Sequence, residues 1–300
     1  MDELIDCHFH IWDLDANYYP WLTDKPNEAV RRVCGDYSRI MKNYRIEDFR
    51  RDHGGLNVVA AVHLQADIDP ADTVRESEWL QSVADSTGNG MPQGFVASVD
   101  LRAADAEQCI ERHCAFANMR GIRTEMHRGG HGALGFDPLT DETWLRNFSL
   151  LERHDLVSEV RAASPEQTED VIRLIREHPS VRFVFPHLAL SLWRDDDAIA
   201  AWRRNIKRYG ELPNAYIKMS GYGLFGADWT IDQVRPFVLH CIEAFGPDRV
   251  VCGSNFPVES LAGSYVRVWE THSTLLDDAG CSGAERAKIL HDNARRLYRL

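Results

Sequence analysis

The sequence contains no run of five or more basic residues and no stretch that approaches the roughly 18 apolar residues of a membrane span. Its 34 Lys and Arg are outnumbered by 46 Asp and Glu, which gives a net charge of −12. A chain of this charge repels phosphate backbones. We therefore expect a small-molecule substrate as the partner, and neither nucleic acid nor a membrane.

Cysteine is scattered, and the seven cysteines show no CxxC spacing. An odd number without such spacing indicates neither a disulfide framework nor a thiolate zinc site. The opening MDELIDCHFH is acidic where a secretory signal is basic and then apolar. We therefore expect a cytoplasmic protein, and the sequence leaves a homo-oligomer open.

No glycine-rich turn follows the first apolar run, which argues against a doubly wound dinucleotide-binding sheet. Apolar runs nevertheless alternate with segments of helical periodicity along the chain. The predicted strands are 4–10, 56–65, 95–101, 121–126, 156–160, 182–188, 215–220 and 250–254. Eight strands over roughly 250 residues favour one α/β domain, residues 1–300, folded as a (β/α)8 TIM barrel.

Residues 11–55, between the first two predicted strands, are longer than the other connections. We expect this insertion to lie over the barrel mouth. It is rich in aromatic residues, and Trp12 is the one nearest the first strand. Such side chains either line a substrate pocket or pack the insertion against the barrel, and the sequence leaves both interpretations open.

The first predicted strand ends in Asp6-Cys7-His8-Phe9-His10, and a period of two places Asp6, His8 and His10 on one face. A third imidazole, His187, closes the sixth predicted strand. The carboxyl ends of barrel strands form the active-site mouth. Three imidazoles there predict a divalent metal site, although hydrogen-bonded structural histidines are the alternative for the pair on the first strand.

These residues resemble the amidohydrolase superfamily, specifically its lactonase-like branch of sugar-acid lactonases and 2-pyrone-4,6-dicarboxylate lactonase. The resemblance covers nearly the whole chain. Five segments carry it in order: DCHFHIWD, FPHLAL, AYIKMSGYG, VVCGSNFPVE and NARRLYRL. It implies a distorted (β/α)8 barrel that hydrolyses a small cyclic ester, with zinc or manganese bound, or without metal.

The resemblance places the metal-ligand and catalytic histidines at His8, His10 and His187, and it places the aspartate of the last strand at Asn255. That departure matters because a carboxylate accepts a proton from the attacking water and a neutral amide does not. Glu159 stands where the superfamily often has a histidine, and it is the first candidate for a replacement base or metal ligand. An arginine partner, Arg123 or Arg161, is the structural alternative for Glu159.

Arg123 resembles the arginine with which this branch holds a substrate carboxylate or carbonyl oxygen. The weaker candidates for substrate contacts are polar or aromatic residues at or near the ends of other strands, namely Gln65, His127, Lys218, Tyr222 and Trp12. Each of these has a structural alternative, such as an ion pair for Lys218.

The sequence therefore predicts a hydrolase that opens a lactone by water attack on a polarised carbonyl. A metal-dependent decarboxylase of an aromatic acid is the second hypothesis, because that reaction tolerates Asn255. A binding relative that has lost turnover is the third, again because of Asn255.

Overall fold

The computed structural model describes residues 2–126, 136–161, 165–190 and 195–300. Eight strands pair in parallel and in the order of the chain. They are β1 Leu4–Phe9, β2 Val58–Leu64, β3 Gly94–Ala97, β4 Met119–Glu125, β5 Val157–Arg161, β6 Phe183–Phe185, β7 Ala215–Met219 and β8 Val250–Cys252. Residues just beyond β8 return to the end of β1, where the Asn255 N–H donates to the His8 carbonyl at 2.6 Å. The predicted (β/α)8 barrel is confirmed.

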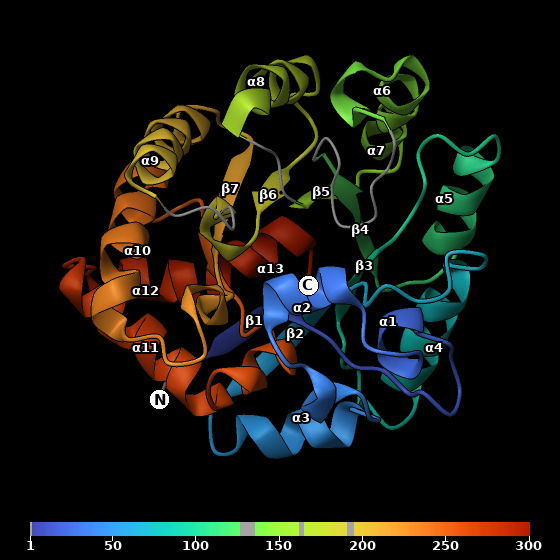
Figure 1. Cartoon of the computed structure of the whole chain (residues 1–300), viewed down its shortest axis with the longest axis horizontal. Coiled ribbons are helices and arrows are strands. Elements are labelled where there is room, and N and C mark those ends of the chain that lie inside the picture. Colours follow the sequence, from blue (N-terminus) through green and yellow to red (C-terminus); the bar gives the residue numbers. More distant parts are fainter. Residues whose placement is uncertain (1, 127–135, 162–164, 191–194) are drawn as a thin grey trace.

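Helices surround the strands (Figure 1). Those before β5 are α1 Pro20–Thr23, α2 Glu28–Cys34, α3 Ile46–His53, α4 Val74–Asp85, α5 Ala106–Cys114, α6 Glu142–Phe148 and α7 Leu150–Arg153. Those after it are α8 Thr168–Glu177, α9 Asp196–Gly210, α10 Ile231–Phe245, α11 Tyr265–Asp278, α12 Gly283–Ala287 and α13 Asn293–Tyr298. None of the helices in the described ranges is long and apolar enough to cross a bilayer.

The barrel interior is an apolar cluster that the strands share with α13. Ile5 and Cys7 of β1, Val157 of β5 and Val251 of β8 contribute to it, and Tyr298 enters from α13. The Arg182 guanidinium, just before β6, donates to the Leu297 carbonyl at 3.1 Å. Helix α13 therefore closes the amino-terminal end of the barrel and leaves the carboxyl end as the mouth.

The C-terminal segment is one continuous helical stretch, residues 283–298, which contains a π-turn. The π-turn, Lys288–Asp292, links α12 to α13. Directly after it, the Asn293 side chain donates to the carbonyls of Pro247 and Val250 at 2.7 and 2.8 Å. These bonds hold the start of α13 beneath β8.

The insertion 11–55 contains α1, α2 and α3 and is held by an internal bridge and by contacts to a loop of the barrel. Trp12 and Tyr44 pair as an antiparallel bridge. The Arg39 guanidinium donates to the carbonyls of Ser260 and Leu261, at 3.1 and 3.2 Å. Because these carbonyls follow β8, the insertion is tied to a loop at the mouth end of the barrel.

Candidate active site

The end of β1 departs from simple strand alternation. The pairing register of β1 with β2 shifts between Asp6 and Phe9. The Asp6 carboxylate turns outward and accepts a hydrogen bond from the Tyr265 hydroxyl of α11 at 3.0 Å. Beyond the shift, the ring of His8 faces His187. The prediction that Asp6 shares a face with both histidines is therefore wrong, because one extra residue in a strand moves the side chains after it to the other face.

The three predicted imidazoles lie together at the mouth. The ring centroids of His8 and His187 are 4.6 Å apart, and those of His8 and His10 are 5.2 Å apart. His10 is held through Nδ1, which lies 2.7 Å from the Leu64 carbonyl. Neither ring nitrogen of His8 has a hydrogen-bond partner among the described residues, although the ring is fully buried. Burying an imidazole without a hydrogen-bond partner costs free energy. The position of His8 at the mouth is therefore typical of a residue that binds a substrate or a metal ion.

His8 of β1 and His10, directly after β1, are both neutral near pH 7. Burial lowers the pKa of His8 well below its ordinary value, and the positive charges of Lys218 and Arg123 act in the same direction. Burial and the Arg123 charge lower the pKa of His10 to about 3. A neutral imidazole keeps a lone pair that can accept a proton or bind a cation. The site therefore offers lone pairs beside a fixed guanidinium charge.

His187 has a left-handed backbone, with φ of 54°, and the two residues after it do too. Its Nδ1 lies 3.0 Å from the Ser220 Oγ. Gly221 follows, and a Cβ there would lie 2.4 Å from the His187 Nδ1. The loop after β7 therefore sets the position of this ring, and three consecutive strained residues at one strand end are typical of a functional site.

Asn255 follows Gly253 and Ser254 after the end of β8. It also has a left-handed backbone, with φ of 58°. The Asp6 carboxylate accepts the backbone N–H groups of His8 and Ser254, at 3.1 and 2.9 Å. Gly253 packs so closely that a Cβ would lie 2.5 Å from that of His8. The ends of β1 and β8 are therefore locked together, and Asn255 is held beside His8.

Glu159 lies inside the barrel and is fully buried. Its Oε1 accepts hydrogen bonds from Lys218 Nζ at 2.7 Å and from the Tyr298 hydroxyl. Lys218 also donates to the Cys7 carbonyl at 2.7 Å. The structure thus joins two predicted site residues in a buried ion pair. This environment favours a role in holding charge inside the barrel over a role for Glu159 as the base.

The other predicted substrate contacts are placed as follows. Arg123 is half-buried and close enough for its charge to act on His8 and His10. Gln65 is buried, and its amide bonds Asp67 at 3.1 Å. Trp12 and Tyr222 are fully buried; the first donates to the Lys42 carbonyl, and the second bonds His272. His127 lies outside the described residues.

One buried carboxyl at this end of the barrel was not predicted. Glu259, in the 3-10 turn Val258–Leu261, accepts the Gly223 N–H at 2.5 Å. Burial raises its pKa to about 7, and the Gly223 N–H acts in the opposite direction. In the sequence, the only available signal is a glutamate four residues after Asn255.

The donor set fits a divalent cation in its chemistry, because the unpaired His8 nitrogens are buried and His10 is anchored through one nitrogen only. No group of three or more His, Cys, Asp or Glu within the described ranges is arranged to hold a metal ion. The three-histidine metal site therefore stays a prediction.

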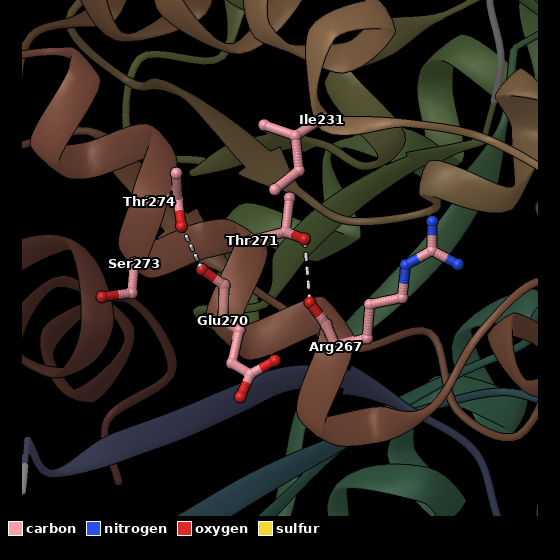
Figure 2. A pocket seen from close by; sticks show the side chains of 6 residues that line it. All are labelled: Ile231, Arg267, Glu270, Thr271, Ser273 and Thr274. Atoms are coloured by element: carbon pink, nitrogen blue, oxygen red, sulfur yellow. Dashed lines mark hydrogen bonds between the residues drawn. The ribbon is translucent and has the colours of Figure 1, made fainter.

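A separate surface hollow of about 470 Å³ lies on the outer helix layer (Figure 2). Ile231 and residues of α11 line it, including Arg267 and Glu270. It contains none of the strand-end residues. The candidate active site is therefore the barrel mouth and not this hollow.

Neutral imidazoles and a guanidinium at the carboxyl end of a (β/α)8 barrel define the site of a barrel enzyme. The amidohydrolase family model matches residues 5–300. The chain belongs to the amidohydrolase family and is a hydrolase.

Several relatives match over the whole length. An uncharacterized protein, y4mH, of Sinorhizobium fredii is 37% identical, with 99% of this chain and 98% of that protein covered. L-Fucono-1,5-lactonase of Burkholderia multivorans is 27% identical, with 99% and 96% covered. A crystal structure of a Burkholderia multivorans amidohydrolase with bound zinc superposes with a TM-score of 0.79 and 23% identity over 99% of each chain.

Proposed function

We propose that the protein opens a sugar-acid lactone by attack of water on the ring carbonyl. The observation that carries this proposal is the buried His8 ring, which is neutral and unpaired within the described chain and packs against the ring of His187. The full-length similarity to L-fucono-1,5-lactonase supports a lactone as the substrate class.

In the proposed reaction, Arg123 faces the carbonyl oxygen and stabilises the negative charge that develops there. Preorganised donors of this kind lower the barrier by several kcal/mol, roughly 3 for a single donor. Asn255 orients the attacking water, because its amide can accept a hydrogen bond from it but not its proton.

His187 takes the proton of the water. Its Nδ1 is held by Ser220 at 3.0 Å, so Nε2 is the nitrogen that faces the mouth. His187 is less buried than His8, so its protonated form keeps more solvation. The imidazolium then donates to the ring oxygen as the ester bond breaks, which yields the hydroxy acid.

A divalent ion, when bound by His8 and His10, would polarise the carbonyl as a Lewis acid. The zinc-bound amidohydrolase of Burkholderia multivorans makes zinc the first metal to test. Elemental analysis of the purified protein, beside His8→Ala, measures this without any substrate.

The proposal is tested with two lactones. L-Fucono-1,5-lactone is taken from the name of the Burkholderia multivorans relative. L-Rhamnono-gamma-lactone is taken from the name of a second relative, L-rhamnono-gamma-lactonase of Scheffersomyces stipitis, which is 26% identical with 99% of each protein covered. Acid release is followed with a pH indicator, with spontaneous hydrolysis subtracted. We expect enzyme-dependent opening of at least one of them. Failure on a wider panel of sugar-acid lactones would contradict the proposal.

Decarboxylation of an aromatic acid remains the second candidate, since the amide of Asn255 cannot act as a base. Mass spectrometry of the product separates the two reactions. Hydrolysis keeps every carbon and adds water, whereas decarboxylation releases carbon dioxide.

A further inference from the structure

Helix α11 carries a buried imidazole that the reaction above does not use. His272 is fully buried, and it shares the buried face of α11 with Val268, Trp269 and Leu275. These positions follow the spacing of an apolar helix face. A polar ring on such a face needs hydrogen-bond partners. The partners of His272 lie in the loops after β7 and β8, which also pack on two imidazoles of the mouth.

Both ring nitrogens of His272 have a partner. Nδ1 lies 2.8 Å from the Tyr222 hydroxyl, and Nε2 lies 3.4 Å from the Gly253 carbonyl. Burial lowers the pKa of His272 to about 4, so the ring is neutral near pH 7 and carries one N–H. A carbonyl oxygen only accepts hydrogen bonds. The proton is therefore on Nε2, and Nδ1 accepts the hydrogen bond of the Tyr222 hydroxyl.

Tyr222 connects His272 to the surroundings of His187. It begins the 3-10 turn Tyr222–Phe225 and follows Gly221 directly. An added Cβ at Gly221 would lie 2.4 Å from the His187 Nδ1. The Tyr222 ring is fully buried, so its hydroxyl can be held by His272 only with the ring in one place. The bond to His272 therefore fixes how the Gly221 backbone lies against His187.

Gly253 connects His272 to His8. Its carbonyl accepts the hydrogen bond from His272, and its N–H donates to the Met219 carbonyl at 3.0 Å. An added Cβ at Gly253 would lie 2.5 Å from the Cβ of His8. The Gly253 backbone is therefore held from both sides while it packs against His8.

We propose that His272 and Tyr222 are positioning residues for two imidazoles of the mouth. Through the two glycine backbones, they set the separation of His8 from His187, whose ring centroids are 4.6 Å apart. The effect of this geometry on turnover rests on the proposed function, but the geometry itself does not.

A second buried histidine provides a matched control. His113 of α5 is fully buried, with Nδ1 2.8 Å from the Ser77 Oγ of α4 and Nε2 3.4 Å from the Thr73 Oγ1. Tyr222→Phe and Ser77→Ala therefore each remove one hydroxyl from the Nδ1 of a buried imidazole. Both should lower the melting temperature, because each leaves that nitrogen without its donor. A difference between them in the mouth reports position and not stability.

The geometry is tested without substrate by NMR of protein labelled with ¹⁵N in its histidine rings. The signals of three rings are assigned by their loss in His272→Gln, His8→Ala and His187→Gln. We expect His272 to show the Nε2–H form in wild type. The signals of His8 and His187 should shift in Tyr222→Phe and stay in place in Ser77→Ala. An Nδ1–H form of His272, or unmoved His8 and His187 signals in Tyr222→Phe, would overturn the proposal.

Kinetics on whichever lactone is opened test the effect on turnover. Displaced rings lose their alignment with the reacting carbonyl, so we expect kcat to fall about tenfold or more in Tyr222→Phe, with KM changed less than about threefold. Ser77→Ala should keep kcat within about twofold of wild type. His272→Gln keeps a donor that can reach the Gly253 carbonyl, so it should retain more activity than His272→Leu, which keeps none.

The outcomes separate the two proposals. If a lactone is opened and kcat in a folded Tyr222→Phe variant stays within about twofold of wild type, the positioning role is overturned and the proposed function stands. Equal losses of kcat in Tyr222→Phe and Ser77→Ala would also overturn it, because they would report lost stability alone. If no lactone is opened but the rings shift as expected, the geometry stands and the proposed function fails.

Discussion

Lys218 Nζ lies 2.7 Å from Glu159 Oε1, and both side chains are fully buried. The two residues come from different strands, β7 and β5, and they meet inside the barrel. A charge of this kind is tolerated only with its partner, because the low-dielectric interior disfavours an isolated ion.

The first prediction concerns this ion pair. Lys218→Met leaves the Glu159 carboxylate without its cation, so we expect the free energy of unfolding to fall by about 3–5 kcal/mol. The double variant with Glu159→Gln removes both charges and should recover most of that loss. Urea unfolding of the three proteins measures it; equal losses in the single and double variants would show that the pair is not coupled.

The second prediction concerns the floor of the barrel. Tyr298→Phe removes the hydroxyl that donates to Glu159 and should cost roughly 1–3 kcal/mol, because it removes a hydrogen bond to a buried carboxylate. Tyr18→Phe is the matched control, since the Tyr18 hydroxyl also bonds a carboxylate, that of Asp24, but at the exposed surface. Thermal unfolding compares them, and similar shifts in melting temperature would count against the buried contact.

Much of the fold follows from sequence periodicity. The eight apolar runs form eight strands in the predicted order. They could be predicted because burial of a strand requires apolar residues at nearby positions, and this pattern is visible in the local sequence. The π-turn in the C-terminal helix could not be predicted. It is followed directly by Asn293, whose carbonyl partners are 43 and 46 residues away in the sequence.

The sequence predicts which residues lie at the candidate site better than it predicts the partners of these residues. His8, His10 and His187 lie together, since strand ends share one end of a parallel barrel. The outward turn of Asp6 depends on a register shift that no local pattern reveals. Glu159 is bonded to Lys218 and Tyr298, which are 59 and 139 residues away in the sequence. The spacing of residues along the chain cannot predict contacts between such distant positions.

The third prediction tests the fit of His187 against Gly221. Gly221→Ala places a Cβ against the His187 Nδ1 and should displace the ring, so we expect turnover to fall at least tenfold. Gly246→Ala is the control, because φ is 68° there against 69° at Gly221, yet no atom lies within 4 Å of the added Cβ. Both variants lose stability through the strained backbone, and only Gly221→Ala should lose activity.

The fourth prediction concerns pH. Burial raises the pKa of Glu76 from 4.5 to about 8. The folded state therefore holds this proton more tightly than the unfolded chain, so the contribution to stability is full below pH 4.5 and is lost as the pH rises toward 8. Glu76→Gln stays neutral and keeps an acceptor for the Ala66 N–H.

The measurement is the difference in unfolding free energy between wild type and Glu76→Gln across this range. We expect wild type to lose up to about 1.4 kcal/mol per pH unit relative to the variant. The exposed Glu78 lies on the same helix, and Glu78→Gln should leave the difference flat. A flat difference for Glu76→Gln as well would show that its carboxyl is not buried as described.

The most direct test of the central claim is kcat/KM for lactone opening in wild type, His187→Gln and His240→Gln, measured side by side. His240 lies on α10 and bonds the Arg203 carbonyl away from the mouth, so it controls for the loss of an imidazole. The account predicts a loss of about 100-fold or more in His187→Gln and less than twofold in His240→Gln. Full activity in a folded His187→Gln variant would contradict it.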